Sequence, residues 1–189
     1  MTLGGLKAHL IRDKMMTILK NKPSEITKND FMQQFSGVYE HSDWVAELLW
    51  EQLEVSVERH CFDTVEAISA QMRNIVDTAS YDLKLALLRA HPDLAGKAAM
   101  AGELTDDSTS EQAGVGLDEL NEEEFQRFQT INESYKAKFK FPFIMAVKGA
   151  TKTQIFDGFD SRIDNSVDVE FARAVNEVHK IAGFRLAEK

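Results

Sequence analysis

Residues 121–139, NEEEFQRFQTINESYKAKF, carry the strongest helical signal in the chain. Asn121 is suited to cap this helix, and three glutamates follow in the first turn, where the helix dipole favours negative charge. Apolar side chains recur along one stripe, as on the buried face of an amphipathic helix: Phe125, Phe128, Ile131, Tyr135 and Phe139. The stretch therefore predicts a long helix that buries one side.

Shorter stretches on both sides of this helix show the same periodicity. We expect further helices at 30–35, 43–60, 64–79, 81–90, 151–163 and 167–189. The caps expected for the first four are Asn29, Ser42, Asp63 and Ser80. Residues 91–118 are rich in Gly, Ser, Asp and Thr and predict short helical pieces at most. The apolar run FPFIMAVKG, 141–149, lies between a proline and a glycine and is typical of either a strand or a buried loop.

Proline is scarce in this chain. Three prolines occur in 189 residues, whereas roughly 5% usage would give about nine. So few helix breakers favour long helices over many short strands. A weaker helical pattern (Leu6, Leu10, Met15, Ile18) precedes a break at Pro23. We therefore expect an N-terminal extension over residues 1–28 and one all-α domain of about seven or eight helices over residues 29–189.

Composition excludes several classes of partner. The chain has 22 basic and 31 acidic residues, a net charge of -9, which disfavours nucleic acid because phosphate binding needs a basic face. No stretch approaches 18 apolar residues, so no membrane span is expected. The single cysteine, Cys61, cannot form an internal disulfide, and the start lacks a secretory pattern, which favours the cytoplasm. The spacing of the histidines predicts no metal site.

His91 is the first candidate for chemistry. It stands where the 81–90 helix must end before Pro92. A helix C-terminus favours the imidazolium, so a histidine there is easily tuned across neutral pH. The alternative is a solvent-facing helix cap with no chemical role.

A polar turn supplies the second candidate. Ser108, Glu111 and Gln112 offer a hydroxyl, a carboxylate and an amide to a polar ligand. Ser108 and Glu111 also have the spacing of a capping box, so the alternative is a helix start and nothing more.

The third candidate pairs the 141–149 run with Arg185. An apolar run without strand neighbours can wall a pocket and offer backbone N–H groups to anionic oxygens. Arg185 lies on a mostly apolar helix, where its guanidinium could clamp a carboxylate or an imide-like edge. The alternative is a surface or interhelical ion pair.

Six segments in a fixed order carry a family resemblance. They are VYEHSDWVAE, LLRAHPDLAGK, LTDDSTSEQAGVGLDEL, FQTINESYKAKFKFPFIMAVKG, RI and EVHKIAGFRL. In this order they resemble the 2-oxo-4-hydroxy-4-carboxy-5-ureidoimidazoline (OHCU) decarboxylases of urate catabolism. The resemblance covers about residues 29–187. Its motifs AHPDLAG, SxxEQxGxGL and FxFPFIxAVKG are specific.

The resemblance implies an all-helical, homodimeric lyase that converts OHCU to S-allantoin and CO2 without a metal or organic cofactor. It assigns catalysis to His91 and Glu111. It assigns substrate contacts to Pro92, Ser108, Gln112 and Arg185 and to the wall formed by Phe143, Ile144, Met145 and Ala146. Two alternatives remain open: a non-catalytic helical module for ligand binding or interaction, and a lyase acting on a related ureido or imidazolone compound.

Overall fold

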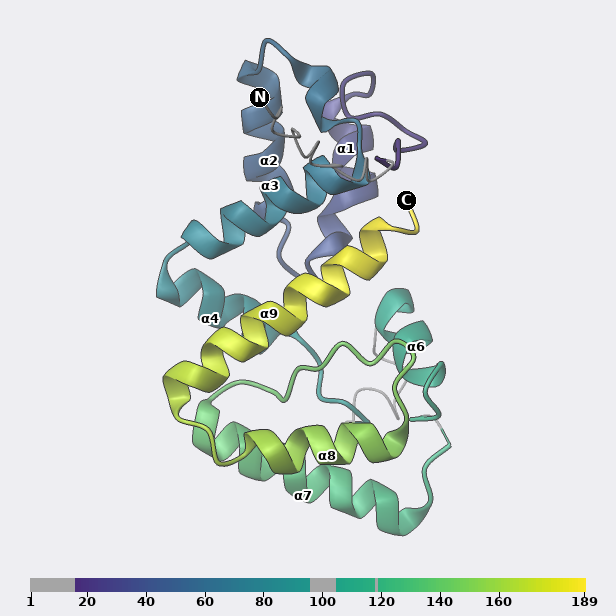
Figure 1. Cartoon of the computed structure of the whole chain (residues 1–189), viewed down its shortest axis with the longest axis vertical. Helices are drawn as coiled ribbons and strands as arrows, with labels where there is room; N and C mark the ends of the chain where they lie inside the picture. Colours follow the sequence, from purple (N-terminus) through teal and green to yellow (C-terminus); the bar gives the residue numbers. More distant parts are fainter. Residues whose placement is uncertain (1–15, 96–104, 118) are drawn as a thin grey trace, which may run out of the picture.

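The C-terminal helix α9 (Val167–Leu186) crosses the middle of the molecule (Figure 1). The computed structural model describes residues 16–95, 105–117 and 119–189. The other α-helices within these ranges are α1 (Lys28–Phe35), α2 (Trp44–Val55), α3 (Val65–Thr78), α4 (Tyr81–Ala90), α6 (Asp106–Ala113), α7 (Glu122–Phe139) and α8 (Lys152–Arg162). No strand is found in the described part of the chain, where one isolated bridge joins Ile18 and Thr64. The prediction of an all-α fold is confirmed.

Helix α9 is buried along most of its length and contacts elements at both ends of the molecule. It packs against α3 and α4 on one side and against α7 on another. Its last turns reach the 3-10 turn at Ser36–Val38, and in Figure 1 its C-terminal end lies near α1. Its buried side chains include four polar ones: Glu170, Glu177, His179 and Arg185. Buried polar groups need hydrogen-bond or ionic partners. The partners of these four side chains lie on neighbouring elements, which α9 thereby holds in place.

Three of the four expected helix caps are wrong. Asp43, not Ser42, is the residue before α2, and its side chain makes no capping hydrogen bond. Thr27, not Asn29, caps α1, because its side chain and that of Asp30 satisfy two backbone N–H groups in a reciprocal capping box. Thr64, not Asp63, caps α3, because the Asp63 carboxylate instead accepts hydrogen bonds from the N–H and hydroxyl of Ser24.

The helix expected at 43–60 is shorter in the structure. It ends at Val55, and a 3-10 turn at Arg59–Phe62 follows. Val55 and Val57 are 83% and 99% exposed, so no apolar contact favours another helical turn beyond this point.

Part of the N-terminal segment packs on the helices. No helix is present between residues 16 and 27, whereas Leu19 is buried and its N–H donates to the carbonyl of Asp63. Leu6, Leu10 and Met15, from the weak helical pattern, lie outside the described residues.

The 141–149 run is a buried loop rather than a strand. Phe143 stacks on Phe159 of α8 with 3.7 Å between ring centroids, and Tyr135 of α7 meets Phe143 edge-on at 5.3 Å. This aromatic packing supplies the burial that a sheet partner would otherwise give. It presses the loop against α7 and α8, which lie side by side below α9 in Figure 1.

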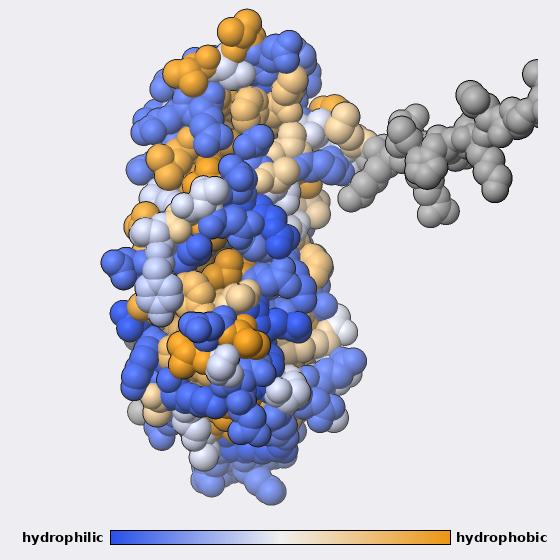
Figure 2. All heavy atoms as spheres, turned by 60° about the vertical axis from the view of Figure 1, so that its left-hand side comes forward, coloured by the Kyte–Doolittle hydropathy of each residue, from blue (hydrophilic) through white to orange (hydrophobic). Residues whose placement is uncertain are grey.

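The face of the molecule drawn in Figure 2 is mostly hydrophilic. Figure 2 shows apolar side chains in separate clusters among charged and polar ones on the face in view. None of the described helices is both long enough and apolar enough to cross a membrane. Within the same described ranges, no group of three or more His, Cys, Asp or Glu side chains is arranged to hold a metal ion.

Candidate active site

His91 is the residue that ends α4, and it is buried rather than solvent-facing. It is 7% exposed, and its Nδ1 lies 3.0 Å from the carbonyl oxygen of Leu87. A carbonyl can only accept, so Nδ1 carries the hydrogen, and Nε2 of the neutral ring has a free lone pair. The interpretation of His91 as an exposed cap is therefore wrong.

Burial also sets the charge of His91. Desolvation lowers the pKa of His91 below its usual value, although the Leu87 hydrogen bond and the charge of Glu40 act in the opposite direction. The loss of hydration lowers the pKa of His91 more than the dipole of α4, which favours the imidazolium, raises it. The site therefore contains a neutral imidazole near pH 7, able to accept a proton at Nε2.

Helix α6 places its three polar candidates differently from a capping box. Thr105 is the N-cap, and Ser108 is the third helical residue. The Ser108 hydroxyl lies 2.7 Å from both carboxylate oxygens of Glu40. The capping-box interpretation of Ser108 is wrong because Thr105 already satisfies the Ser108 N–H. One turn on, Gln112 Oε1 accepts the N–H of Ala95 at 2.9 Å.

Arg185 does form an interhelical ion pair, and it is buried. Its side chain is 4% exposed. Its Nε and Nη2 each lie 3.0 Å from one carboxylate oxygen of Glu111, in a bidentate pair. Nη2 also lies 3.1 Å from Glu40, and Nη1 donates to the carbonyl of Gly37 at 3.3 Å. Arg185 thus connects α9 to α6 and to the segment that follows α1.

Glu40 is a site residue that the sequence analysis missed. It is 3% exposed and accepts hydrogen bonds from Thr105 and Ser108 in addition to the ion pair with Arg185. Burial alone would raise the pKa of Glu40, but the two hydroxyl donors and the charge of Arg185 outweigh it and lower the pKa. The only signal in the sequence was its place in the VYEHSDWVAE segment, because no periodicity or spacing marks it.

These side chains surround one cavity. Its lining includes nine of the ten predicted site residues: His91, Pro92, Ser108, Glu111, Gln112, Phe143, Ile144, Met145 and Arg185. Glu40, Leu94, Val147 and Ile181 complete the lining. The tenth, Ala146, does not line it, and its N–H donates to Glu177 of α9 at 3.0 Å. The cavity combines an apolar wall from the 141–149 loop with a polar wall from α4, α6 and α9.

The apolar wall is held from behind by a buried charge cluster. Arg162 of α8 donates from Nη1 to the carbonyl of Ile144 at 2.9 Å. Arg162 also pairs with Glu170, whose side chain is fully buried and which accepts a hydrogen bond from the Tyr135 hydroxyl. Because the Ile144 carbonyl is bonded to Arg162, the orientation of the adjoining peptide is fixed.

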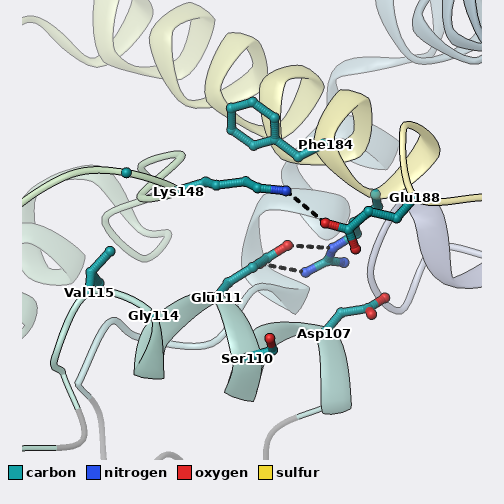
Figure 3. Close-up of a pocket in the computed structure, with 10 residues that line it drawn as sticks. Asp107, Ser110, Glu111, Gly114, Val115, Lys148, Phe184 and Glu188 are labelled. Atoms are coloured by element: carbon teal, nitrogen blue, oxygen red, sulfur yellow. Dashed lines mark hydrogen bonds and ion pairs between the residues drawn. The ribbon is translucent and has the colours of Figure 1, made fainter.

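A larger cleft of about 210 Å³ adjoins the cavity, and Glu111 and Arg185 line both spaces. Figure 3 shows the Lys148 side chain extending from the loop across this cleft to Glu188, above Glu111. Lys148 Nζ lies 2.7 Å from Glu188. We call this space the outer cleft and the one around His91 the inner cavity.

Comparison with known proteins gives consistent matches. Residues 24–187 match the sequence profile described as OHCU decarboxylase. The chain is 41% identical over 165 residues to 2-oxo-4-hydroxy-4-carboxy-5-ureidoimidazoline decarboxylase of Halalkalicoccus jeotgali, covering 87% of this chain and 88% of that one. The protein of the same name from Haloferax volcanii is 39% identical over 166 residues, covering 88% and 92%.

Two solved structures resemble this one. A crystal structure of (S)-allantoin synthase superposes with a TM-score of 0.68 at 32% identity, over 87% of this chain and 51% of that chain, so this chain spans about half of it. A crystal structure of OHCU decarboxylase in the presence of (S)-allantoin has a TM-score of 0.62 at 23% identity, covering 81% and 94%, and shares the fold.

Proposed function

Because the chain belongs to the OHCU decarboxylase family, we propose that the inner cavity around His91 is its active site. The chain is a carboxy-lyase that converts OHCU to allantoin and CO2 in urate catabolism. The observation that supports the location is the convergence of nine predicted residues from four separate segments on one cavity. All ten predicted residues lie within residues 29–189, which we propose as the catalytic domain, with residues 1–28 as an extension.

The substrate ring can itself take up the electron pair that decarboxylation releases, so the reaction does not depend on an external electron sink. When CO2 leaves C4 of the ring, its bonding electrons form a C4=C5 double bond, and the electron pair of the adjacent C=N bond moves to nitrogen, which takes a proton from solvent. The C4 hydroxyl then loses its proton as it becomes a carbonyl, and C5 gains a proton. The enzyme must therefore orient the carboxylate and move one proton from oxygen to carbon. We propose that no metal or organic cofactor takes part.

His91 is suited to move that proton. Its Nε2 lone pair can accept the proton of the C4 hydroxyl, and the imidazolium can return it to one face of C5. The fixed Nδ1–H···Leu87 bond holds the ring plane during both steps. Delivery from one side accounts for a single enantiomer, and we propose that it is S. A positioned acid or base of this kind typically contributes about 10²- to 10⁴-fold.

The remaining polar groups would hold the substrate in place. Glu111, fixed by the bidentate Arg185 pair, can accept hydrogen bonds from the ureido N–H groups. Gln112 uses Oε1 for Ala95, so its Nε2 is the group that we assign to a ring carbonyl. Pro92 and the wall formed by Phe143, Ile144 and Met145 shape the cavity.

The substrate must extend beyond the inner cavity. That cavity holds about 30 Å³ of free space, room for about one or two water molecules. The outer cleft adjoins this cavity, since Glu111 and Arg185 line both spaces. We propose that the reacting ring occupies the inner cavity and that the substituents reach into the outer cleft.

We further propose a homodimer in the cytoplasm. Exposed apolar side chains near the start of α9 and α4 would form the contact: Val167, Val169, Tyr81 and Leu83. Tyr81 stacks on Phe171 at 4.7 Å, which brings the two helix starts together. Cys61 is an exposed free thiol, as suits a reducing compartment. Light scattering on the purified chain tests the mass, and a monomer at micromolar concentration would contradict the dimer.

A coupled assay tests the function directly. Urate is oxidised by a uricase, the hydroxyisourate formed is hydrolysed, and circular dichroism follows allantoin with and without this protein. We expect the protein to accelerate the appearance of one enantiomer. An unchanged rate would favour a non-catalytic ligand-binding module or a related ureido or imidazolone substrate.

A further inference from the structure

Among the residues that the structure describes, the lining of the inner cavity offers no free cation to an anionic substrate. Its ionised groups are Glu40, Glu111 and Arg185, and His91 is neutral. The bidentate edge of Arg185 is already taken by Glu111, and its Nη2 also serves Glu40. The substrate carboxylate would therefore meet two carboxylates and one fully engaged guanidinium.

Lys148 lines the outer cleft together with Glu111 and Arg185. It follows Val147, which lines the inner cavity, and its own side chain lines the outer cleft. Its ammonium lies above Glu111, the ion-pair partner of Arg185, in Figure 3. Its Nζ lies 5.5 Å from the ring centroid of Phe184. A carboxylate projecting from the inner cavity into the outer cleft would meet this ammonium first.

The present partner of Lys148 is easily replaced. The side chains of Lys148 and Glu188 are 52% and 65% exposed, and ion pairs at such exposure contribute little to stability. Glu188 lies in the last three residues, after the end of α9 at Leu186. A substrate carboxylate could therefore take its place without disturbing the fold.

We propose that Lys148 determines specificity for the carboxylated substrate by exchanging Glu188 for the carboxylate of OHCU in the outer cleft. This inference rests on the proposed function of the inner cavity. When the C–C bond breaks, the negative charge moves into the ring and CO2 leaves on the side of the outer cleft. The product has no carboxylate, so Glu188 returns to Lys148 and the neutral product is released.

The position of Lys148 predicts an effect on KM rather than on kcat. In Lys148→Gln, KM for OHCU should rise about tenfold, the loss expected of one charge-assisted hydrogen bond. The kcat should be unchanged or higher, because the interaction weakens as the carboxylate becomes CO2. Lys148→Arg should restore most of the affinity. Glu188→Gln should lower KM about two- to threefold, because it removes the competing carboxylate.

The controls separate recognition from general charge and from structure. Lys22 and Glu25 form an ion pair at 2.8 Å with side chains 41% and 64% exposed, so Lys22→Gln makes the same change in net charge elsewhere and should leave KM unchanged. Inhibition by added allantoin, which lacks the carboxylate, should be equal in wild type and Lys148→Gln.

Each outcome decides the inference. Three outcomes would overturn the role of Lys148: an unchanged KM in Lys148→Gln, allantoin inhibition weakened in that variant as much as OHCU binding, or a raised KM in Glu188→Gln. In each of these cases wild-type activity would still support the proposed function. A wild-type chain that does not accelerate allantoin formation would overturn the proposed function, and the inference with it.

Discussion

The chemistry of His91 depends on a single hydrogen bond and on burial. Because the Leu87 carbonyl fixes the hydrogen on Nδ1, replacing His91 removes the only buried imidazole in the lining of the inner cavity. We expect His91→Ala to lower kcat about 10²- to 10⁴-fold and to leave the helical circular dichroism spectrum unchanged, because the residue ends a helix. Turnover equal to wild type would contradict the assignment.

The lowered pKa of His91 predicts the pH dependence of catalysis. Burial shifts the pKa below 6.5, so the ring stays neutral as the pH falls to that value, and it gains a proton only below it. We expect kcat/KM to stay level from neutral pH down to about 6.5 and then to decline. The measurement is a pH–rate profile, and a decline centred above pH 6.5 would show that His91 is not the base.

Sequence patterns predicted which residues belong to the site better than they predicted the burial and partners of those residues. Pro92 correctly placed His91 at a helix end, but whether the ring faced water depended on segments far apart in the chain. Glu40 was missed because its meaning arises only when α6 and α9 bring Ser108 and Arg185 to it. A lone buried carboxylate leaves no periodic trace in sequence.

Helices α8 and α9 are joined by the Arg162–Glu170 pair, which stabilises the packing of these two elements. Both side chains are almost fully buried, at 7% and 0% exposed. We expect Arg162→Met to lower the free energy of unfolding by about 3–5 kcal/mol, because it leaves Glu170 buried without its charge partner. Urea unfolding measures this.

The matched control is the exposed pair of Arg127 and Asp160, with side chains 52% and 68% exposed. Arg127→Met should change the free energy of unfolding by about 0.5 kcal/mol or less. An equal loss of unfolding free energy in the two variants would show that the buried Arg162–Glu170 pair stabilises the protein no more than the exposed pair does.

Thr105 links the start of α6 to the active site. It caps the helix and also donates to Glu40 at 2.6 Å. Thr27 caps α1 without any contact to the site. We expect Thr105→Ala and Thr27→Ala each to cost about 1 kcal/mol of stability, whereas only Thr105→Ala should reduce kcat/KM. Equal activity of the two variants would argue against a role of Glu40 in the site.

At the level of elements, hydrophobic periodicity predicted that a helix is present better than it predicted where the helix ends. The helix expected from Asn121 onward is present as Glu122–Phe139. Of its apolar stripe, Phe128, Ile131, Tyr135 and Phe139 pack in or against the core, whereas Phe125 does not. The helix expected at 43–60 stops at Val55 because burial, which sequence does not display, ends there. The 141–149 run stayed ambiguous because its partners are aromatic rings on α7 and α8 rather than a neighbouring strand.

The whole molecule should lose stability in two stages as the pH falls. Burial lowers the pKa of His91 and of His179, although Asp77 opposes it at His179. The unfolded chain therefore binds more protons below pH 6.5, and unfolding becomes easier. Burial would raise the pKa of Glu40 and Glu177, but their hydrogen bonds lower it, so a second loss begins below about pH 4.5.

Urea unfolding across this pH range tests the linkage. The first decline should be smaller in His91→Asn than in wild type, because one of the two histidines with a lowered pKa is gone. An undiminished first decline would assign it to other groups.

The course of α9 through the molecule sets limits on insertions and deletions. Glu170, Glu177 and Arg185 lie on this one helix and serve the buried cluster, the loop and the active site in turn. Inserting or deleting one residue between any two of them would rotate the later side chains by about 100° and misdirect them together. Single substitutions on its exposed side are harmless by comparison. Length variation among catalysts built on this scaffold is therefore expected in the connections between helices, while the number of residues between Glu170 and Arg185 stays constant.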